Sequence, residues 1–326
     1  MTPTWFDPDR QHPRRRRWLA HLSAALVVLG LAGCRVTTSA AIDTLAARIP
    51  AEGTSGTLDV GTWNLEWFGD ANNGPTNDSL QLATAASAIQ AMDLDIMGLQ
   101  EIVSASQFAE LDARLPNHVG ILASAPQVTG GAAAYSAGEQ KLAILYKPRV
   151  ATLLGARVVL ANVSADFAGR PPLELSFRVS TGGTTRDVVV LVVHMKAFTD
   201  LDSWQRRVNA AEALKLYLDQ TYPTQRVIVI GDFNDDLDAS ISGGRLSPYA
   251  NFIADVPRYA FPTALLSLSR IPTTVGFADA VDHHLATNEM MQDYVAASAH
   301  VVRLDRYITG YGTITSDHYP VVTSYR

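Results

Sequence analysis

The stretch Val227–Asp236, VIVIGDFNDD, joins a buried strand to a group of polar side chains. Four apolar residues followed by a glycine are typical of a strand in a sheet interior that ends in a turn. Asp232 and Asn234 come next, and a carboxylate and an amide at this point could equally form an Asx turn. The meaning of the stretch therefore depends on whether other strands end in the same way.

Acids, amides or histidines border four other apolar runs. The runs and their polar neighbours are Leu58–Trp63 with Asn64 and Glu66, Ile96–Leu99 with Glu101, Val188–Val193 with His194, and Tyr319–Thr323 with the preceding Asp317 and His318. Each residue taken alone has an ordinary structural interpretation, such as a turn, a cap or a core histidine. Strand ends of α/β proteins face a common rim, so the group as a whole predicts one shared pocket.

Helical and hairpin patterns lie between these strands. The clearest helices, strand and hairpin are expected at Leu80–Met92, Trp204–Tyr222, Leu142–Tyr146, and Leu173–Val179 with Arg186–Val193 around the turn Thr181-Gly182-Gly183. This mixed order predicts an α/β fold with mixed sheets covered by helices. Residues 57–326 contain no linker and are expected to form one domain.

The composition is that of a globular protein without a basic face. Of 326 residues, 47% are hydrophobic and 18% are charged, which suffices to bury a large core. The formal net charge is −6, so a nucleic-acid enzyme would need locally concentrated Lys and Arg, or metal ions, to meet phosphate. The charge argues mildly against tight DNA binding but not against turnover of DNA.

Residues 1–34 resemble a bacterial lipoprotein signal peptide. Arg14–Arg17 form a positive start, and the apolar stretch Trp18–Leu31 is shorter than the ~20 residues of a transmembrane helix. Leu31-Ala32-Gly33-Cys34 resembles the lipobox, so cleavage would leave Cys34 as a lipidated N-terminus. An ordinary signal peptide is the alternative, and the lipobox is favoured because Cys34 is the only cysteine of the chain.

Residues 35–56 are expected to be a tether of small and polar residues, with a short helix around Ile42–Ile49. The residue after Cys34 is Arg35 rather than Asp, which favours the outer membrane or cell surface over retention at an inner membrane. We therefore expect an extracytoplasmic lipoprotein of the cell envelope, attached to the membrane through its anchor. The sequence implies no protein partner, and a monomer is expected.

The polar residues at the strand ends suit phosphoester hydrolysis. Carboxylate and amide oxygens are ligands for a hard cation such as Mg²⁺, which also binds substrate phosphate. A histidine held by a carboxylate can act as a general base on water. A zinc site is disfavoured because His283 and His284 are adjacent and would point to opposite faces of a strand.

Seven segments resemble the endonuclease/exonuclease/phosphatase superfamily, in order and over essentially all of residues 57–326. They are TWNLEWFGD, DIMGLQEI, EQKLAILYKP, VVHMKAF, VIVIGDFNDD, VDHHLAT and TSDHYPVV. The resemblance implies a four-layer sandwich, in which two packed mixed β-sheets are flanked by helices. It also implies hydrolysis of phosphate esters with Mg²⁺, with Mn²⁺ or a structural or activating Ca²⁺ as alternatives.

The resemblance assigns a role to each matching position. Glu101 resembles the principal metal ligand, and Asn64 and Asp317 resemble its partners in the metal site. Asp232 resembles the residue that positions or activates water, and Asn234 resembles an amide that contacts phosphate. His318 resembles the essential base or phosphate-contacting histidine, which Asp282 would orient.

Three further positions favour a deoxyribonuclease-I-like member over a repair enzyme. His194 matches a second active-site histidine, Glu139 the carboxylate that orients that histidine, and Arg170 a phosphate-contacting arginine. Glu66 and Val103 depart from this group, because pancreatic-type enzymes have DNA-contacting arginines there. The departures weaken the inference to duplex DNA, and Glu66 instead resembles a repair-type carboxylate that binds or tunes a cation.

The sequence therefore predicts an exported, divalent-metal-dependent phosphodiesterase whose favoured activity is that of a nuclease on DNA or RNA. The alternative is a phosphodiesterase or phosphatase that acts on lipid head groups or small phosphate esters, which a membrane anchor would also suit. A binding scaffold without catalysis is disfavoured, because the family's acidic residues, amide and histidine are all present.

Overall fold

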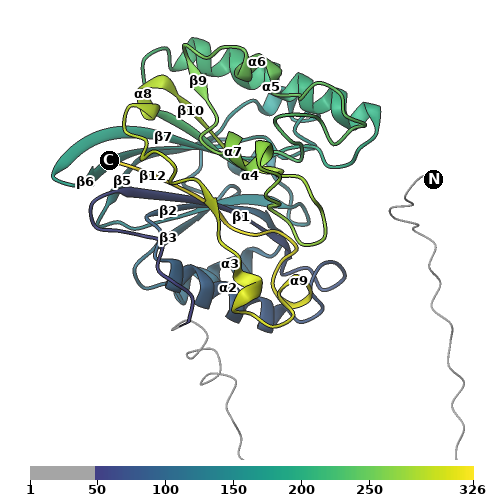
Figure 1. The fold of residues 1–326 in the computed structure, drawn as a ribbon. Coiled ribbons are helices and arrows are strands. Elements are labelled where there is room, and N and C mark those ends of the chain that lie inside the picture. The colour runs from purple at the N-terminus through teal and green to yellow at the C-terminus, as the bar shows by residue number, and fades with distance from the viewer. Residues whose placement is uncertain (1–47) are drawn as a thin grey trace, which may run out of the picture. The chain divides into compact units, whose positions relative to one another are not determined.

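The computed structural model describes residues 48–326, and the predictions that concern residues 1–47 lie outside it. Two mixed six-stranded sheets pack face to face, and helices cover their outer faces (Figure 1). The first sheet has the order β11 (His300–Val301), β12 (Val321–Tyr325), β1 (Leu58–Phe68), β2 (Ile96–Ile102), β4 (Lys141–Tyr146) and β3 (Val119–Leu122). The second has the order β5 (Ala151–Val158), β6 (Leu173–Thr181), β7 (Thr184–His194), β8 (Val227–Asp232), β10 (Asp282–Thr287) and β9 (Tyr259–Ala260). The predicted four-layer sandwich is confirmed.

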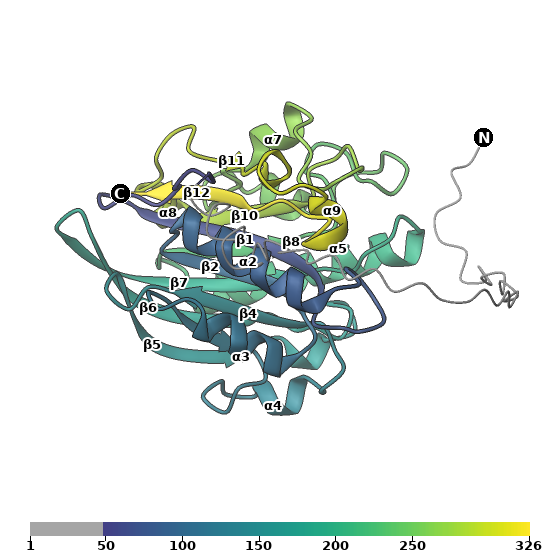
Figure 2. The ribbon, with the colours of Figure 1, turned by 90° about the horizontal axis from the view of Figure 1, so that it is seen from below.

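The helices differ greatly in length. They are α2 (Asp78–Met92), α3 (Ala105–Ala113), α4 (Gly131–Ala134), α5 (Leu201–Thr221), α6 (Ala250–Ile253), α7 (Ala264–Leu268), α8 (Asn288–Met291) and α9 (Tyr311–Ile314), with the 3₁₀ turns η1 (Ala161–Val163) and η2 (Leu304–Arg306). Helices α2, α3 and α9 lie on the side of the first sheet, and α5 and α6 lie on the side of the second (Figures 1 and 2). No helix among residues 48–326 combines the length and apolar character that a membrane span requires.

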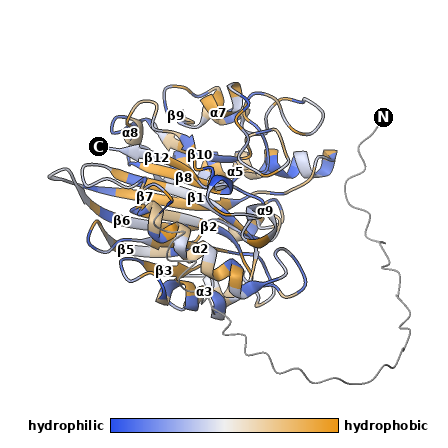
Figure 3. Cartoon of the chain, turned by 60° about the horizontal axis from the view of Figure 1, so that its bottom comes forward, coloured by the Kyte–Doolittle hydropathy of each residue, from blue (hydrophilic) through white to orange (hydrophobic). Residues whose placement is uncertain are grey.

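Alternation of side chains along the central strands produces three apolar layers. In β7, Val188, Val190 and Val192 face the space between the sheets, where they meet residues such as Ile96 and Ile230. The alternate residues, from Val189 to Val193, face α5 and pack against Leu214. A third cluster lies between the first sheet and α2. Figure 3 shows apolar residues along the strands of both sheets.

Each sheet contains one parallel pair of strands that a long helix connects. Strand β1 runs parallel to β2 through α2, and β7 runs parallel to β8 through α5. Parallel strands need such a crossover, and their carboxyl ends then lie at the same edge of the sheet. The antiparallel neighbours β4, β10 and β12 begin where those strands end. These connections gather distant segments at one rim.

Residues 49–54, which the sequence analysis assigned to the tether, pack on the domain. Ile49 is buried in the cluster beneath α2, and the N–H groups of Glu52 and Gly53 donate to the carbonyl of Met92. Thr54 also donates to Asp59. An apolar side chain in a short polar segment was sufficient to fix it on the core, so the structured part begins before residue 57.

The remaining strand and helix predictions agree with the structure apart from their ends. His283 and His284 do point to opposite faces of β10, as expected for neighbours on a strand. His283 contacts the carbonyl of Ala280 and lies edge-on to Phe233, whereas His284 bonds Thr323 of the other sheet. Neither histidine is available for a shared metal ion.

Candidate active site

Strand register brings the predicted residues together at the rim described above. His194 and Asp232 are paired neighbours at the ends of β7 and β8. Asp282, the first residue of β10, is paired with Asp232 from the other side. Asn64 lies in β1 and Glu101 at the end of β2, in the facing sheet.

Asn64 joins the two sheets at the centre of the site. Its amide nitrogen donates to Glu101 Oε1 and to Asp232 Oδ2, both at 3.0 Å. Its amide oxygen accepts from the Glu66 backbone N–H at 2.9 Å. The role of Asn64 as a metal ligand stays a prediction, and its buried side chain connects the carboxylates of Glu101 and Asp232.

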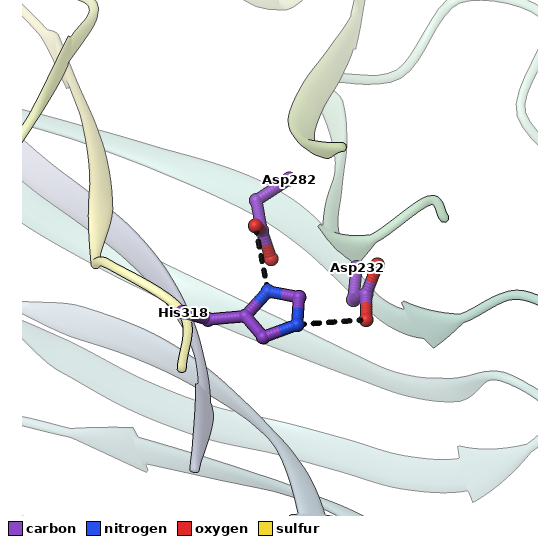
Figure 4. Close-up of side chains that lie close together, drawn as sticks. All are labelled: Asp232, Asp282 and His318. Atoms are coloured by element: carbon purple, nitrogen blue, oxygen red, sulfur yellow. Dashed lines mark hydrogen bonds and ion pairs between the residues drawn. The ribbon is translucent and has the colours of Figure 1, made fainter. Parts of the chain in front are cut away.

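His318 lies between two aspartates, as Figure 4 shows. Its Nδ1 is 2.9 Å from Asp282 Oδ2, and its Nε2 is 3.8 Å from Asp232 Oδ2. Burial alone would lower the pKa of His318, but the charges of Asp282, Asp232 and Asp317 together raise that pKa well above its usual value. The predicted pairing of Asp282 with His318 is present, and the imidazole is a cation at neutral pH.

Backbone contacts hold the His318 segment in place. The His318 N–H donates to Ser316 Oγ at 2.9 Å, and the Ser316 hydroxyl donates to the Asn64 carbonyl at 2.6 Å. The buried Trp63 ring nitrogen donates to the His318 carbonyl at 3.0 Å, which also accepts from the Tyr311 hydroxyl. Ser316, Trp63 and Tyr311 are supporting residues that the strand-end pattern did not identify.

Asp232 is surrounded by polar side chains and is almost inaccessible to solvent. Besides Asn64, its neighbours are His194 Nε2 at 3.5 Å and the Asn234 backbone N–H at 2.8 Å. Burial raises the pKa of Asp232 to about 7, although the positive charge of His318 opposes this shift. A carboxyl group with such a pKa can accept a proton near neutral pH.

His194 is neutral, whereas His318 is positively charged. Burial, and then the charges of Arg170 and His318, lower its pKa well below the usual value, so its imidazole is neutral. Its Nδ1 has no hydrogen-bond partner among residues 48–326. The predicted contact with Glu139 is absent, because the Glu139 carboxylate accepts from the Ser136 backbone N–H at 2.6 Å within its own turn.

Gln140, the neighbour of Glu139, lies in the site and contacts Glu101 and Arg170 rather than His194. Its amide nitrogen donates to Glu101 Oε2 at 2.7 Å, and its amide oxygen accepts from Arg170 at 2.6 Å. The pairing of Ile102 with Lys141 places Gln140 beside the end of β2. A sequence search that also included the residue just before β4, the antiparallel neighbour of β2, would have identified Gln140.

Arg170 and Asn234 both reach the loop that follows β7. Arg170 Nη2 and Asn234 Nδ2 donate to the Met195 carbonyl, at 2.9 Å and 3.2 Å respectively. The Nε of Arg170 is buried without a partner among residues 48–326. Both predicted phosphate-contacting residues therefore lie in the site, and Arg170 keeps a donor that no atom of residues 48–326 uses.

A second acidic group lies around Glu66. Burial, and then the charge of Asp317, raise the pKa of Glu66 to about 8, and the charge of Glu101 adds to this shift. Glu66 Oε2 is buried and has no hydrogen-bond partner among residues 48–326. Three carboxyl groups with an unused buried oxygen fit a hard divalent cation, because such a cation removes their repulsion. The metal roles of Glu101, Asp317 and Glu66 stay predictions.

Asp232, Asp282 and His318 are a further group whose ligand atoms all lie within 4.8 Å of one another, close enough to hold a metal ion. Here, however, His318 already contacts one aspartate and is positively charged. With the proton on His318 the group can handle a proton and bind phosphate, and without that proton it could hold a metal ion.

Backbone strain is concentrated at the same rim. Ten non-glycine residues of the described chain have positive φ, and five of them are Glu66, Trp67, Glu101, Phe198 and Asn234. Glu101 has φ 61° at the end of β2, and its Oε2 accepts from the Trp67 N–H at 2.9 Å. Strained backbone of this kind persists where contacts impose it and is typical of functional sites.

The sequence profile of the endonuclease/exonuclease/phosphatase family matches residues 61–318. A search among curated proteins finds no match to this chain. Among solved structures, similar folds include a humanized TDP2 of D. rerio (14% identity, TM-score 0.57, 83% of this chain and 99% of that chain). TDP2 of D. rerio complexed with single strand DNA product is 13% identical, with a TM-score of 0.56 and the same coverage of 83% and 99%.

Two other similar structures have different names. The human Nocturnin catalytic domain with bound sulfate anion is 16% identical, with a TM-score of 0.53 over 83% of this chain and 94% of that chain. A mannosyl-6-phosphatase of Bacteroides thetaiotaomicron is also 16% identical, with a TM-score of 0.52 over 82% and 98%. At these identities the comparisons show a shared fold.

Proposed function

Because the chain belongs to the endonuclease/exonuclease/phosphatase family, and is thus an enzyme of phosphate-ester hydrolysis, we propose that it is a metal-dependent nuclease of the cell envelope. The observation that carries the proposal is the position of Asp232. Its buried carboxylate lies within 3.8 Å of two histidines, His194 at the end of β7 and His318 just before β12. One histidine is neutral and the other is positively charged. This arrangement allows a proton to be moved beside the Asp232 carboxylate.

The residues divide the reaction between them. Asp232 accepts the proton of the attacking water, while the neutral imidazole of His194 lies beside it. The His318 cation, fixed by Asp282, and the Arg170 guanidinium stabilise negative charge on the phosphoryl oxygens. Asn234 presents its amide at the same rim. The water oxygen bonds to phosphorus, the bond from phosphorus to the ester oxygen breaks, and the leaving oxygen takes up a proton to become a hydroxyl group.

Glu101, Glu66 and Asp317 would hold the divalent cation, for which Mg²⁺ is the proposed ion. When bound, the cation supplies Lewis-acid stabilisation of the phosphoryl oxygens and the leaving group. Members of this family generally use a divalent metal. The buried, unpartnered oxygen of Glu66 supports this assignment.

Nucleic acid is the proposed substrate class. TDP2 of D. rerio, which shares the fold, has been crystallised with a single-stranded DNA product. Glu66 and Val103 stand where pancreatic-type enzymes have arginines, so single strands are favoured over duplex DNA. The similarity to a mannosyl-6-phosphatase keeps small phosphate esters as the second candidate.

The substrate is tested by a panel assayed with Mg²⁺: plasmid, single-stranded DNA, RNA, sphingomyelin, mannose 6-phosphate and bis(p-nitrophenyl) phosphate. The proposal expects the highest kcat/KM on single-stranded DNA or RNA, loss of activity in EDTA, and recovery on addition of Mg²⁺ or Mn²⁺. Hydrolysis of mannose 6-phosphate or sphingomyelin without any cleavage of nucleic acid would replace the nuclease proposal by the second candidate. Turnover that resists EDTA would refute the role of the cation.

Export and anchoring are a separate part of the proposal. The lipobox-like Leu31-Ala32-Gly33-Cys34 supports cleavage and lipidation at Cys34. A chain anchored in this way is expected in the membrane fraction of its host, and C34A is expected in the soluble fraction. If both proteins fractionate as soluble, the anchor does not exist.

A further inference from the structure

The loop that follows His194 carries an exposed aromatic ring. Phe198 is 64% exposed, and its backbone φ of 80° lies in the left-handed region, which bulky residues seldom adopt. Such a conformation is retained only where the surroundings impose it. The backbone that carries the ring is therefore held in a defined conformation at the surface.

A buried guanidinium imposes this conformation. Arg207 of α5 donates through Nη1 to the carbonyl oxygens of Lys196 and Phe198, at 2.6 Å and 2.8 Å. Its Nε donates to Asp235 Oδ2 at 2.8 Å, and both side chains are completely buried. Its Nη2 donates to Ser242 Oγ at 2.8 Å. One charge-paired group thus ties the Phe198 loop to the loop that follows Asn234.

The loop starts at the reaction centre. Its first residue, Met195, accepts hydrogen bonds from Arg170 and Asn234, the two residues placed at the phosphate. Lys196 directly follows Met195, whose carbonyl accepts from Arg170 at 2.9 Å, so two basic residues meet at this loop. Lys196 and Arg170 therefore supply positive charge beside a site that also carries the carboxylates of Asp232 and Glu101.

The aromatic ring and the cations are arranged side by side. The Lys196 ammonium is 4.1 Å from the centroid of the Phe198 ring, which occupies one face of that ring. The exposure of the residue leaves the opposite face open to a planar partner. Proteins bind single-stranded nucleic acid with an open aromatic face, on which a base stacks, and with neighbouring cations, which contact the phosphate backbone.

We propose that Phe198 and Lys196 form a nucleotide subsite beside the scissile phosphate. An unpaired base stacks on the open face of Phe198, and the phosphate of the same nucleotide meets the Lys196 ammonium. Paired bases in a duplex do not offer a free face to such a ring, so the subsite selects single strands. This inference rests on the proposed nuclease function and specifies its substrate.

The test uses two oligonucleotides of equal length, one with bases and one in which the nucleotides around the cleavage position are abasic. The full-length chain is compared with F198A, F198L and F198W. The measured quantity is the ratio of kcat/KM for the base-containing strand to kcat/KM for the abasic strand. L216A is the matched control, because Leu216 is a 57% exposed residue of α5, roughly 25 Å further along the helix axis than its start.

The subsite predicts that F198A lowers this ratio about tenfold, because base–aromatic stacking contributes about that much per base. F198L should lower the ratio similarly, F198W should preserve it, and L216A should not change it. K196Q should weaken the salt dependence of binding to single-stranded DNA by about one unit of slope.

Two results would overturn the inference. If F198A cleaves both strands with an unchanged ratio while the parent chain is an active nuclease, the nuclease function stands and the stacking subsite is refuted. If F198L behaves like the parent, bulk rather than aromatic character matters and the subsite is again refuted. If the parent chain cleaves neither strand but hydrolyses mannose 6-phosphate, the proposed function fails first and the subsite fails with it.

Discussion

At the residue scale, Glu66 is the side chain whose surroundings are hardest to explain without a bound cation. Its carboxyl group is partly buried beside Asp317 and Glu101, and one of its oxygens has no partner among residues 48–326. Repulsion and burial together raise its pKa to about 8. A divalent cation would reverse this, because it favours the ionised form of all three carboxyl groups.

E66Q should therefore weaken Mg²⁺ binding while preserving the fold. We expect the rise in melting temperature on addition of Mg²⁺ to require about tenfold more Mg²⁺ in this variant, because one ligand charge is lost. The measurement is a thermal melt over a Mg²⁺ titration. E139Q is the matched control, because among the hydrogen bonds of the described chain the Glu139 carboxylate accepts only from the Ser136 backbone N–H.

An equal response of E66Q and E139Q to Mg²⁺ would contradict the assignment of the cation to Glu66.

Asn64 and Gln140 illustrate what the sequence could not supply at this scale. Both amides hold Glu101, but hydrogen-bond direction follows from the three-dimensional contacts and not from residue type. The choice between Glu139 and Gln140 likewise depended on the turn before β4.

At the element scale, close packing of the two sheets depends on Gly98 in β2. A Cβ atom at this position would lie 2.8 Å from Ile230 Cδ1 and 3.1 Å from Val192 Cγ2, side chains of the facing sheet. Gly155 in β5 has no atom within 4 Å of the corresponding position and is the matched control. Comparing alanine substitutions at the two glycines separates the effect of reduced backbone flexibility, which both share, from that of steric overlap, which only Gly98 has.

G98A should lower the free energy of unfolding by about 1–3 kcal/mol, the usual cost of overpacking a core. G155A should change it by less than about 0.5 kcal/mol, because its Cβ meets open space. Both values can be measured by urea denaturation. A G98A protein as stable as G155A would show that the sheets can separate locally without cost.

The segment before β1 is held to β11 by a titratable pair. His300 Nε2 lies 2.9 Å from Glu52 Oε2, and this hydrogen bond raises the pKa of His300. A raised histidine pKa means that the stabilisation is complete below the ordinary histidine pKa, about 6.5, and is lost as pH rises through the raised pKa. The His300 side chain is 45% exposed, so solvent screens the pair.

E52Q should consequently lower the melting temperature at pH 5.5 and leave it unchanged at pH 9. The expected loss at pH 5.5 is a few tenths of a kcal/mol, as for other exposed ion pairs. Thermal melts of both proteins at the two pH values make the comparison. A destabilisation of equal size at both values would show that the charge of His300 has no part in fixing this segment.

Element order was the part of the fold that the sequence predicted well. Runs such as Val227–Ile230 are apolar on both faces, which identified central strands, and the polar residue after each run identified the rim. The burial of Ile49 was not predicted, because the sequence does not show what the end of the tether packs against. Its burial depends on the groove beside α2, which only the folded sheet creates.

At the scale of the whole molecule, the site exists because two βαβ units place their strand ends face to face. Asn64 and Glu101 come from one sheet, whereas His194 and Asp232 come from the other. The sequence predicted that these groups converge, and the structure confirms it. The Arg207–Asp235 pair was not predicted, because a charged residue inside an amphipathic helix reads as surface until its partner in another loop is known.

The convergence of both sheets on Asp232 is tested most directly by comparing D232N with the parent chain. Activity on single-stranded DNA with saturating Mg²⁺ and the melting temperature are measured on the same preparations. The account predicts that D232N loses at least about 10²-fold in kcat, because the group that accepts the proton of water is gone, while its melting temperature does not fall. A folded D232N protein that cleaves as fast as the parent would contradict the account.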